Sequence, residues 1–183
     1  MHLSKAFSVS ALLLGTASAF KPSQVHATGC HGETPSLYCY DGKGDTPQNV
    51  DTDDIAYVAK ALRNYGRETE EGRFLTMTAS NAPDCAEWTL YTYHTVLVLA
   101  KHVFTTVDSS VLFEDIARTI DGGQAISDDM HKGIIGCHNN GGARAVLVNE
   151  THPSYHSDEY RKSGYSPNGI LIKIVANKAH FDL

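Results

Sequence analysis

Four ionisable side chains on neighbouring predicted strands could together cleave RNA. His94 and His102, with Glu87 and Arg73, could supply a general acid, a general base and a clamp for the phosphate. Secreted microbial ribonucleases use sets of this kind, but the sequence does not fix the register of the strands. The favoured interpretation is therefore that these residues lie on the solvated face of a sheet.

A second polar group follows in the C-terminal part of the chain. His152 and His156 are four residues apart, and Asp158 and Glu159 come next. Such a set could bind a divalent metal ion, but Pro153 argues against one helix carrying both histidines, and the motif H-E-x-x-H is absent. We expect a solvated loop here, and we predict neither a metal nor another cofactor.

Aromatic and basic residues alternate in the stretch that follows. Tyr155, Tyr160, Arg161 and Tyr165 could together contact a carbohydrate, a peptide or a partner protein. A packed crossover segment with exposed ends is the favoured alternative. If the protein is a binder, these four residues are the predicted contact residues.

The first 19 residues have the pattern of a secretory signal peptide. Lys5 provides a positive charge, residues 7–14 form a short apolar core, and Ala17-Ser18-Ala19 is a small-x-small cleavage site. The apolar core is too short to span a bilayer of roughly 30 Å. We expect cleavage after residue 19 and a secreted, extracellular protein.

Cysteine usage agrees with that compartment. The mature chain contains four cysteines: Cys30, Cys39, Cys85 and Cys137. An even number in an oxidising compartment predicts two disulfides, and the closely spaced pairs that zinc requires are absent. The N-x-T motif at residues 149–151 makes Asn149 a predicted glycosylation site.

Composition predicts one folded domain. The 183 residues include 15 Lys or Arg and 21 Asp or Glu, for a formal net charge of -6. This acidity argues against non-specific nucleic-acid binding and against docking on anionic membranes. We place the domain at residues 29–176, after a flexible lead-in at 20–28 and before a frayed tail at 177–183.

Periodicity and turn residues predict the elements that carry these side chains. One helix is expected at residues 52–65, capped by Asp51 or Thr52 and ended by Gly66. A second runs from Ser109 or Ser110 to about residue 120, a third from 127 to about 135, and one or two helical turns lie at 157–163. Strands are expected at residues 37–40, 73–79, 87–92, 95–101, 143–149 and 170–176.

The order of these elements predicts the fold class. Strands and helices do not alternate strictly, so a doubly wound parallel sheet is disfavoured. We expect an α+β fold, in which a largely antiparallel sheet has two main helices packed on one face and disulfides staple the chain.

Short motifs resemble a family of fungal killer toxins, the killer-protein-four type. The opening Gly29-Cys30-His31-Gly32, the helix end Ile134-Ile135-Gly136-Cys137 and the closing strand at 167–172 are similar to elements of that family. The resemblance implies a disulfide-stapled α/β sandwich that interferes with cation channels, notably calcium channels, of competing fungi or plants. Related proteins of plant-associated fungi are candidate effectors.

Four cysteines allow three pairings, of which we weigh two. One is Cys30–Cys39 with Cys85–Cys137, and the other is Cys30–Cys137 with Cys39–Cys85. The second is favoured because Cys39 and Cys85 stand at edges of predicted strands, and neighbouring strands lie about 5 Å apart. The resemblance implies the bond from Cys30 to Cys137.

We therefore expect a secreted fungal effector or toxin-like protein that acts by binding rather than by catalysis. Its expected partner is a protein or cell-surface target in a host or competitor, with a cation channel implied by the resemblance. No nucleic-acid partner and no stable membrane insertion are expected. The alternatives are a small secreted hydrolase such as a ribonuclease, and a carbohydrate- or cell-wall-binding protein.

Overall fold

The structure of the chain is a computed structural model that describes residues 30–70, 72–123 and 132–181. The predicted signal peptide and lead-in, at residues 1–28, lie outside the described residues. So do residues 124–131, which include the start of the third predicted helix.

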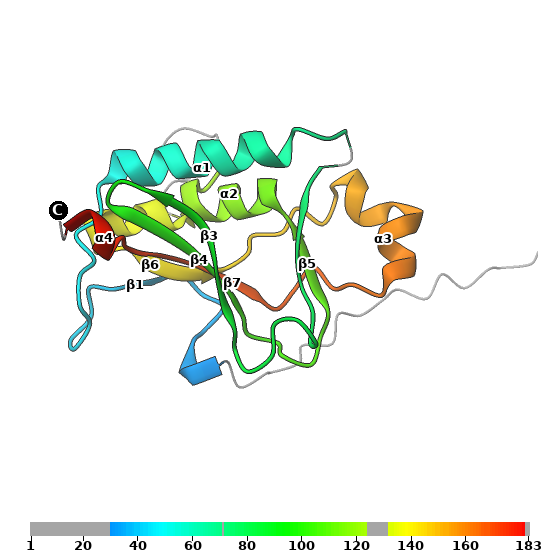
Figure 1. The fold of residues 1–183 in the computed structure, drawn as a ribbon, viewed down its shortest axis with the longest axis horizontal. Helices are drawn as coiled ribbons and strands as arrows, with labels where there is room; N and C mark the ends of the chain where they lie inside the picture. The colour runs from blue at the N-terminus through cyan, green and yellow to red at the C-terminus, as the bar shows by residue number, and fades with distance from the viewer. Residues whose placement is uncertain (1–29, 71, 124–131, 182–183) are drawn as a thin grey trace, which may run out of the picture.

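A five-stranded antiparallel sheet forms the centre of the fold (Figure 1). Its strand order is β1-β6-β7-β4-β3, so the long strands β7 and β4 pair in the middle. The strands are β1 (Tyr38–Cys39), β6 (Gly142–Ala145), β7 (Ile170–Ala176), β4 (Val96–His102) and β3 (Glu87–Tyr93). β3 and β4 form a hairpin, and the strand predicted at 170–176 is confirmed.

Two helices pack against each other and cover one face of this sheet (Figure 1). They are α1 (Thr52–Gly66) and α2 (Phe113–Asp121). Asp51 caps α1 by accepting a hydrogen bond from the Asp53 amide, as the sequence predicts. Alternate residues of β4 and β7 meet these helices, and all are buried: Val96, Val98, Ala100, Ile170, Ile172 and Ile174. The α+β class and the layer of two helices are therefore confirmed.

A second sheet of two strands corrects the predicted start of the second helix. β2 (Phe74–Met77) pairs antiparallel with β5 (Ser109–Leu112), and α2 begins only at Phe113. Ser110 does not cap the helix, because its hydroxyl lies 2.8 Å from the hydroxyl of Thr76 across the two strands. Pairing with β2 therefore overrides the local helix signal.

Short elements complete the chain. They are η1 (Cys30–Gly32), η3 (Ile134–Asn140), η4 (Pro153–His156), α3 (Asp158–Ser163) and α4 (Lys178–Phe181). Two of the predicted elements, the third helix and the strand at 143–149, differ in the structure. The described end of the third predicted helix is the 3-10 segment η3, which runs beyond Cys137. The strand predicted at 143–149 leaves the sheet after Ala145. The helical turns predicted at 157–163 are confirmed by α3, which Ser157 caps.

The two disulfides join Cys30 to Cys85 and Cys39 to Cys137, so both pairings weighed from the sequence are wrong. Cys39 lies in β1, and Cys85 precedes β3, at the opposite edge of the sheet. Four strand spacings separate these edges by about 19 Å, which no disulfide can bridge. Cys39 instead meets the η3 segment, whose chain continues into the neighbouring strand β6.

Close approach at the second disulfide depends on Gly142. A Cβ atom at this position would lie 3.0 Å from the Cys137 sulfur and 2.6 Å from the Tyr38 carbonyl oxygen. The absence of a side chain therefore lets β1, β6 and η3 converge on the bond between Cys39 and Cys137.

Peptide mapping of the non-reduced protein should recover Cys30 with Cys85 and Cys39 with Cys137. The bonds span sequence separations of 55 and 98 residues. Loops of this size are expected to stabilise the fold by about 4 kcal/mol or more in the chain-entropy model. Cys39→Ser combined with Cys137→Ser should therefore lower the free energy of unfolding in urea by that order. A recovered Cys30–Cys137 peptide would contradict the structure.

Two arginine–carboxylate pairs connect α1 to α2, and they differ in burial. Arg63 is 5% exposed and donates to both carboxylate oxygens of Asp121, at 2.8 and 2.7 Å. Arg67 pairs with Glu114 at the surface, where the arginine side chain is 51% exposed. A buried carboxylate that loses its partner is costly, whereas an exposed pair contributes little.

Arg63→Ala should therefore destabilise the protein far more than Arg67→Ala. We expect a loss of about 3 kcal/mol for the buried pair, because the Asp121 carboxylate would lose both hydrogen bonds from the guanidinium and keep only the one from the Gly123 amide. The matched exposed variant should lose less than about 1 kcal/mol. Urea unfolding of both variants measures the difference, and equal losses would show that the Arg63 pair is not effectively buried.

Candidate binding groove on the outer face of the sheet

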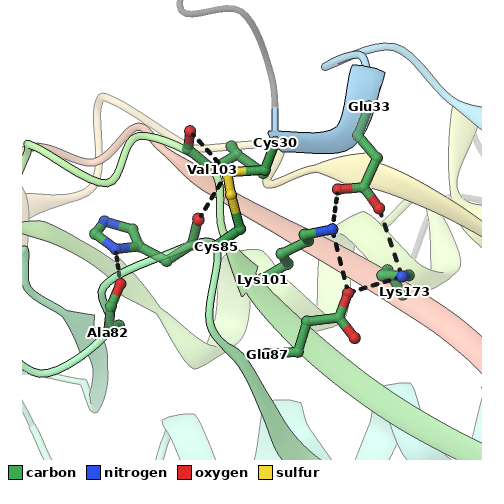
Figure 2. The surroundings of a disulfide bond; sticks show 9 residues. Cys30, Glu33, Ala82, Cys85, Glu87, Lys101, Val103 and Lys173 are labelled. Atoms are coloured by element: carbon green, nitrogen blue, oxygen red, sulfur yellow. Dashed lines mark hydrogen bonds and ion pairs between the residues drawn. A yellow bond between two sulfur atoms is a disulfide. The ribbon is translucent and has the colours of Figure 1, made fainter.

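Four charged side chains form a closed ring on the sheet face opposite the helices (Figure 2). Lys101 lies 2.7 Å from Glu33 and 3.4 Å from Glu87. Lys173 lies 2.8 Å from Glu87 and 3.4 Å from Glu33. Each lysine thus has two carboxylates, and the four charges sum to zero. We call these four residues the ion ring.

Strand register places three members of the ion ring, and a disulfide places the fourth. Glu87 and Lys101 are direct partners across β3 and β4. Lys101 is opposite Leu171 of β7, so Lys173, two residues further, is on the same face. Glu33 follows η1, which the Cys30–Cys85 bond holds against the end of β4 (Figure 2).

Opposite charges within the ion ring shift the pKa values of Glu87 and Lys173 so that both side chains are charged at neutral pH. Burial alone would raise the pKa of Glu87, but the hydrogen bond from Lys173 and the charges of both lysines outweigh it and lower that pKa. Burial alone would lower the pKa of Lys173, but Glu87, Tyr40 and Glu33 outweigh it and raise that pKa. Glu87 and Lys173 therefore stabilise each other's charged forms, and neither is poised for proton transfer.

A groove of about 320 Å³ opens beside the ion ring. Tyr38 forms its exposed wall, with 49% of its surface accessible, and donates a hydrogen bond of 2.7 Å to Asp45. Tyr40 lies deeper, and burial raises the pKa of its hydroxyl to about 12. The groove is lined by Gly32, Glu33, Thr34, Tyr38, Tyr40, Ala143 and Leu171. Its aromatic walls, together with the carboxylate of Glu33 beside them, suit recognition of another molecule.

The structure does not bring the four candidate ribonuclease residues together. His102 is fully buried, and its ring nitrogens lie 2.8 Å from the Ala82 carbonyl oxygen and 2.9 Å from the Val107 carbonyl oxygen. His94 lies at the tip of the β3–β4 hairpin, roughly 25 Å along β4 from His102. A single substrate cannot reach both histidines.

The two remaining members of that set also have other partners. Glu87 belongs to the ion ring. Arg73 pairs with Glu68 at 2.7 Å, and its guanidinium lies 4.3 Å from the ring centre of Tyr65. Neither side chain is directed at a histidine.

The candidate metal ligands are likewise engaged separately. His152 accepts a hydrogen bond from the Ser154 amide, and the His156 ring lies 2.7 Å from the Glu150 carbonyl oxygen. Asp158 pairs with a lysine on α3, and Glu159 is exposed in the same helix. Within the described part of the chain, no cluster of three or more potential ligands could hold a metal ion.

Of the four predicted contact residues, Tyr155 is buried, Tyr160 is half-buried and two are exposed. Tyr155 is 6% exposed, donates to Asp115 at 2.7 Å and accepts from the Leu112 amide at 2.9 Å. Tyr160 donates to the Ser110 carbonyl oxygen at 2.8 Å. These two tyrosines therefore hold α3 and η4 against β5. The two exposed residues are Arg161 and Tyr165.

The predicted glycosylation motif lies in a surface turn. Asn149 is half-buried, and its side-chain oxygen accepts a hydrogen bond of 2.8 Å from the Thr151 hydroxyl. Glu150 and Thr151 are exposed, so the turn is accessible from outside.

Sequence reasoning missed the ion ring and the tyrosine groove. One signal was available: Lys101 ends an apolar strand, and Lys173 interrupts the run Ile-Leu-Ile-Lys-Ile-Val-Ala of β7. A lysine at such a position is expected to have a carboxylate partner. The identity of the partners, however, depends on strand order and on a disulfide.

Comparison with protein-family models, with curated proteins and with solved structures finds no match for this chain. Among the described residues, no helix is both long and apolar enough to cross a membrane.

The ion ring should stabilise the fold only in a window of pH. The lowered pKa of Glu87 gives stability that is lost as the pH falls through it, and the raised pKa of Lys173 gives stability that is lost as the pH rises through it. The contribution should therefore be complete between about pH 5 and pH 10.

Urea unfolding at several pH values tests this prediction. The difference in unfolding free energy between the wild type and the double variant Glu87→Gln, Lys173→Met should be constant inside that window. Outside the window, on the acid side and on the alkaline side, the wild type should lose stability relative to the double variant. A difference that is independent of pH from 3 to 11 would show that the ring charges do not titrate with folding.

Proposed function

We propose that the chain is a secreted effector or toxin-like protein that acts outside the producing cell by binding a target in a host or competitor. The proposal combines the signal-peptide pattern of residues 1–19 with two long-range disulfides, which are typical of proteins from oxidising compartments. Both disulfides anchor the segment at residues 30–40, which forms one wall of the groove.

The burial of His102 is the observation that favours a binding function over a catalytic one. A general base must reach its substrate, and this imidazole is 0% exposed with both ring nitrogens close to backbone oxygens. The ribonuclease alternative loses the histidine that it requires, while the groove beside Tyr38 offers an accessible surface without needing any proton transfer.

The kind of target follows from the killer-toxin resemblance. The α+β class agrees with what that resemblance implies, but the Cys30–Cys137 bond that it also implies is not formed. A cation channel of a competing fungus or of a plant is therefore the proposed target, and the groove of Tyr38 and Tyr40 is the proposed contact surface.

The test compares two exposed tyrosines on the purified secreted protein with its disulfides intact. Tyr38→Ala removes the wall of the groove, whereas Tyr65→Ala removes a ring of similar exposure, 41%, on α1. Cytosolic calcium is recorded in fungal hyphae and in plant cells during exposure to each protein. We expect the wild type and Tyr65→Ala to alter the calcium signal at the same concentration, and Tyr38→Ala to need about tenfold more.

Two controls separate this proposal from its alternatives. N-terminal sequencing of the exported protein should begin at Phe20, which checks secretion. Single-stranded RNA incubated with the wild type should remain intact. Turnover of RNA, or an unchanged calcium signal with the wild type in both cell types, would overturn the proposal.

A further inference from the structure

Four aromatic rings, none of which lines the Tyr38 groove, form a continuous row at one end of the molecule. The Tyr57 and Tyr93 rings stack with centres 3.9 Å apart, and the His94 ring lies 4.3 Å from that of Tyr93. The His180 ring follows at 5.8 Å from His94. We call these residues the aromatic row. They come from α1, the β3–β4 hairpin and α4; Figure 1 shows the start of α1, the tip of the hairpin and α4 at the same end of the molecule.

The aromatic row is accessible. Tyr57 is 45% exposed although it lies on the helix that supplies much of the core. His94 and His180 are exposed, and Tyr93 is half-exposed. Large aromatic side chains normally bury their faces, so a row of rings that stack mainly on one another has surface left for a ligand.

The hairpin tip that carries the row is held in a strained conformation. His94 has a φ of 43°, a value that favours glycine over a residue with a side chain. Three contacts hold the turn: Thr95 donates to Asp54 at 2.6 Å and accepts from the Asp51 amide at 2.8 Å, and Asn177 donates to the His94 carbonyl oxygen at 2.8 Å. Strain that the surroundings maintain is typical of functional positions.

A groove of about 450 Å³ adjoins α4, the element that carries His180. Gln48 is fixed there, because its side-chain oxygen accepts from the Ala176 amide and its nitrogen donates to the Thr46 carbonyl oxygen. The groove is lined by Thr46, Pro47, Gln48, Asn49, Ala176 and Lys178. Hydroxyl and amide groups therefore dominate its polar lining, with one ammonium group.

We propose that the aromatic row and this adjoining groove form a binding site for a neutral oligosaccharide. A sugar ring has an apolar C–H face, which stacks on an aromatic ring, and hydroxyl groups at its edge, which pair with amides and hydroxyls. Nucleobases also stack on aromatic rings, but the net charge of -6 repels their phosphates. The site is distinct from the Tyr38 groove, and the proposal does not depend on the proposed channel target.

Titration calorimetry with four uncharged hexasaccharides tests the site. The probes are the hexamers of β-1,3-glucose, β-1,4-glucose, N-acetylglucosamine and mannose, each added to the full secreted protein. At least one should bind the wild type, and Tyr57→Ala should weaken that binding about tenfold. Tyr57→Phe, which keeps the ring, should bind as the wild type does. Tyr65→Ala, on the same helix, and Tyr38→Ala, in the other groove, should also leave the affinity unchanged.

His94→Gly separates a ligand-binding role from a structural one. Glycine adopts a positive φ without strain, so this variant should melt at the same temperature as the wild type or higher. Its affinity for the hexasaccharide should nevertheless fall, because the ring is lost. If the row were purely structural, this variant would not combine an unchanged or higher melting temperature with a lower affinity for the hexasaccharide.

Three results would overturn the proposal. The first is that none of the four probes binds the wild type at millimolar concentration. The second is that Tyr57→Ala, folded as judged by its melting temperature, keeps full affinity. The third is tighter binding of single-stranded oligoadenylate than of any hexasaccharide, which would assign the row to nucleobases.

Discussion

Lys101 is a charged side chain buried in β4, and carboxylates from two other parts of the chain neutralise it. A buried ammonium group costs several kcal/mol unless carboxylates surround it. Register supplies Glu87 from the neighbouring strand. Glu33 must come from a segment outside the sheet, and the Cys30–Cys85 disulfide fixes where that segment lies. The same segment then forms the wall of the groove. The position of this one segment therefore determines the disulfide, the ion ring and the groove together.

The ion ring explains why the outer face of the sheet suits recognition better than catalysis. Catalytic acids and bases need a proton-binding equilibrium near the working pH, whereas the charges of Glu87 and Lys173 stabilise each other away from it. The groove instead takes one member of the ring, Glu33, into its lining. The walls are tyrosines, which present a large apolar surface with a polar tip and lose little conformational freedom on binding.

Local patterns in the sequence predicted much of the fold, and long-range contacts account for the rest. The cap and apolar face of α1 and the alternating residues of β4 and β7 are local signals, and these elements are confirmed. Residues 109–112 carry a local helix signal but pair with β2 instead. The disulfide pairing failed for a similar reason: it depends on strand order, which places Cys39 and Cys85 at opposite edges. The ion ring required both pieces of information.

The two histidines of the hairpin illustrate why residue type alone was insufficient to predict a site. His102 and His94 belong to the same pair of strands, and the sequence offers both as catalytic groups. Register and packing place the first in the core, with its nitrogens against backbone oxygens. They place the second at an exposed, strained turn beside other rings. One histidine therefore connects loops to the sheet, and the other is available to a ligand. Burial, which the sequence gives only indirectly, decides between these roles.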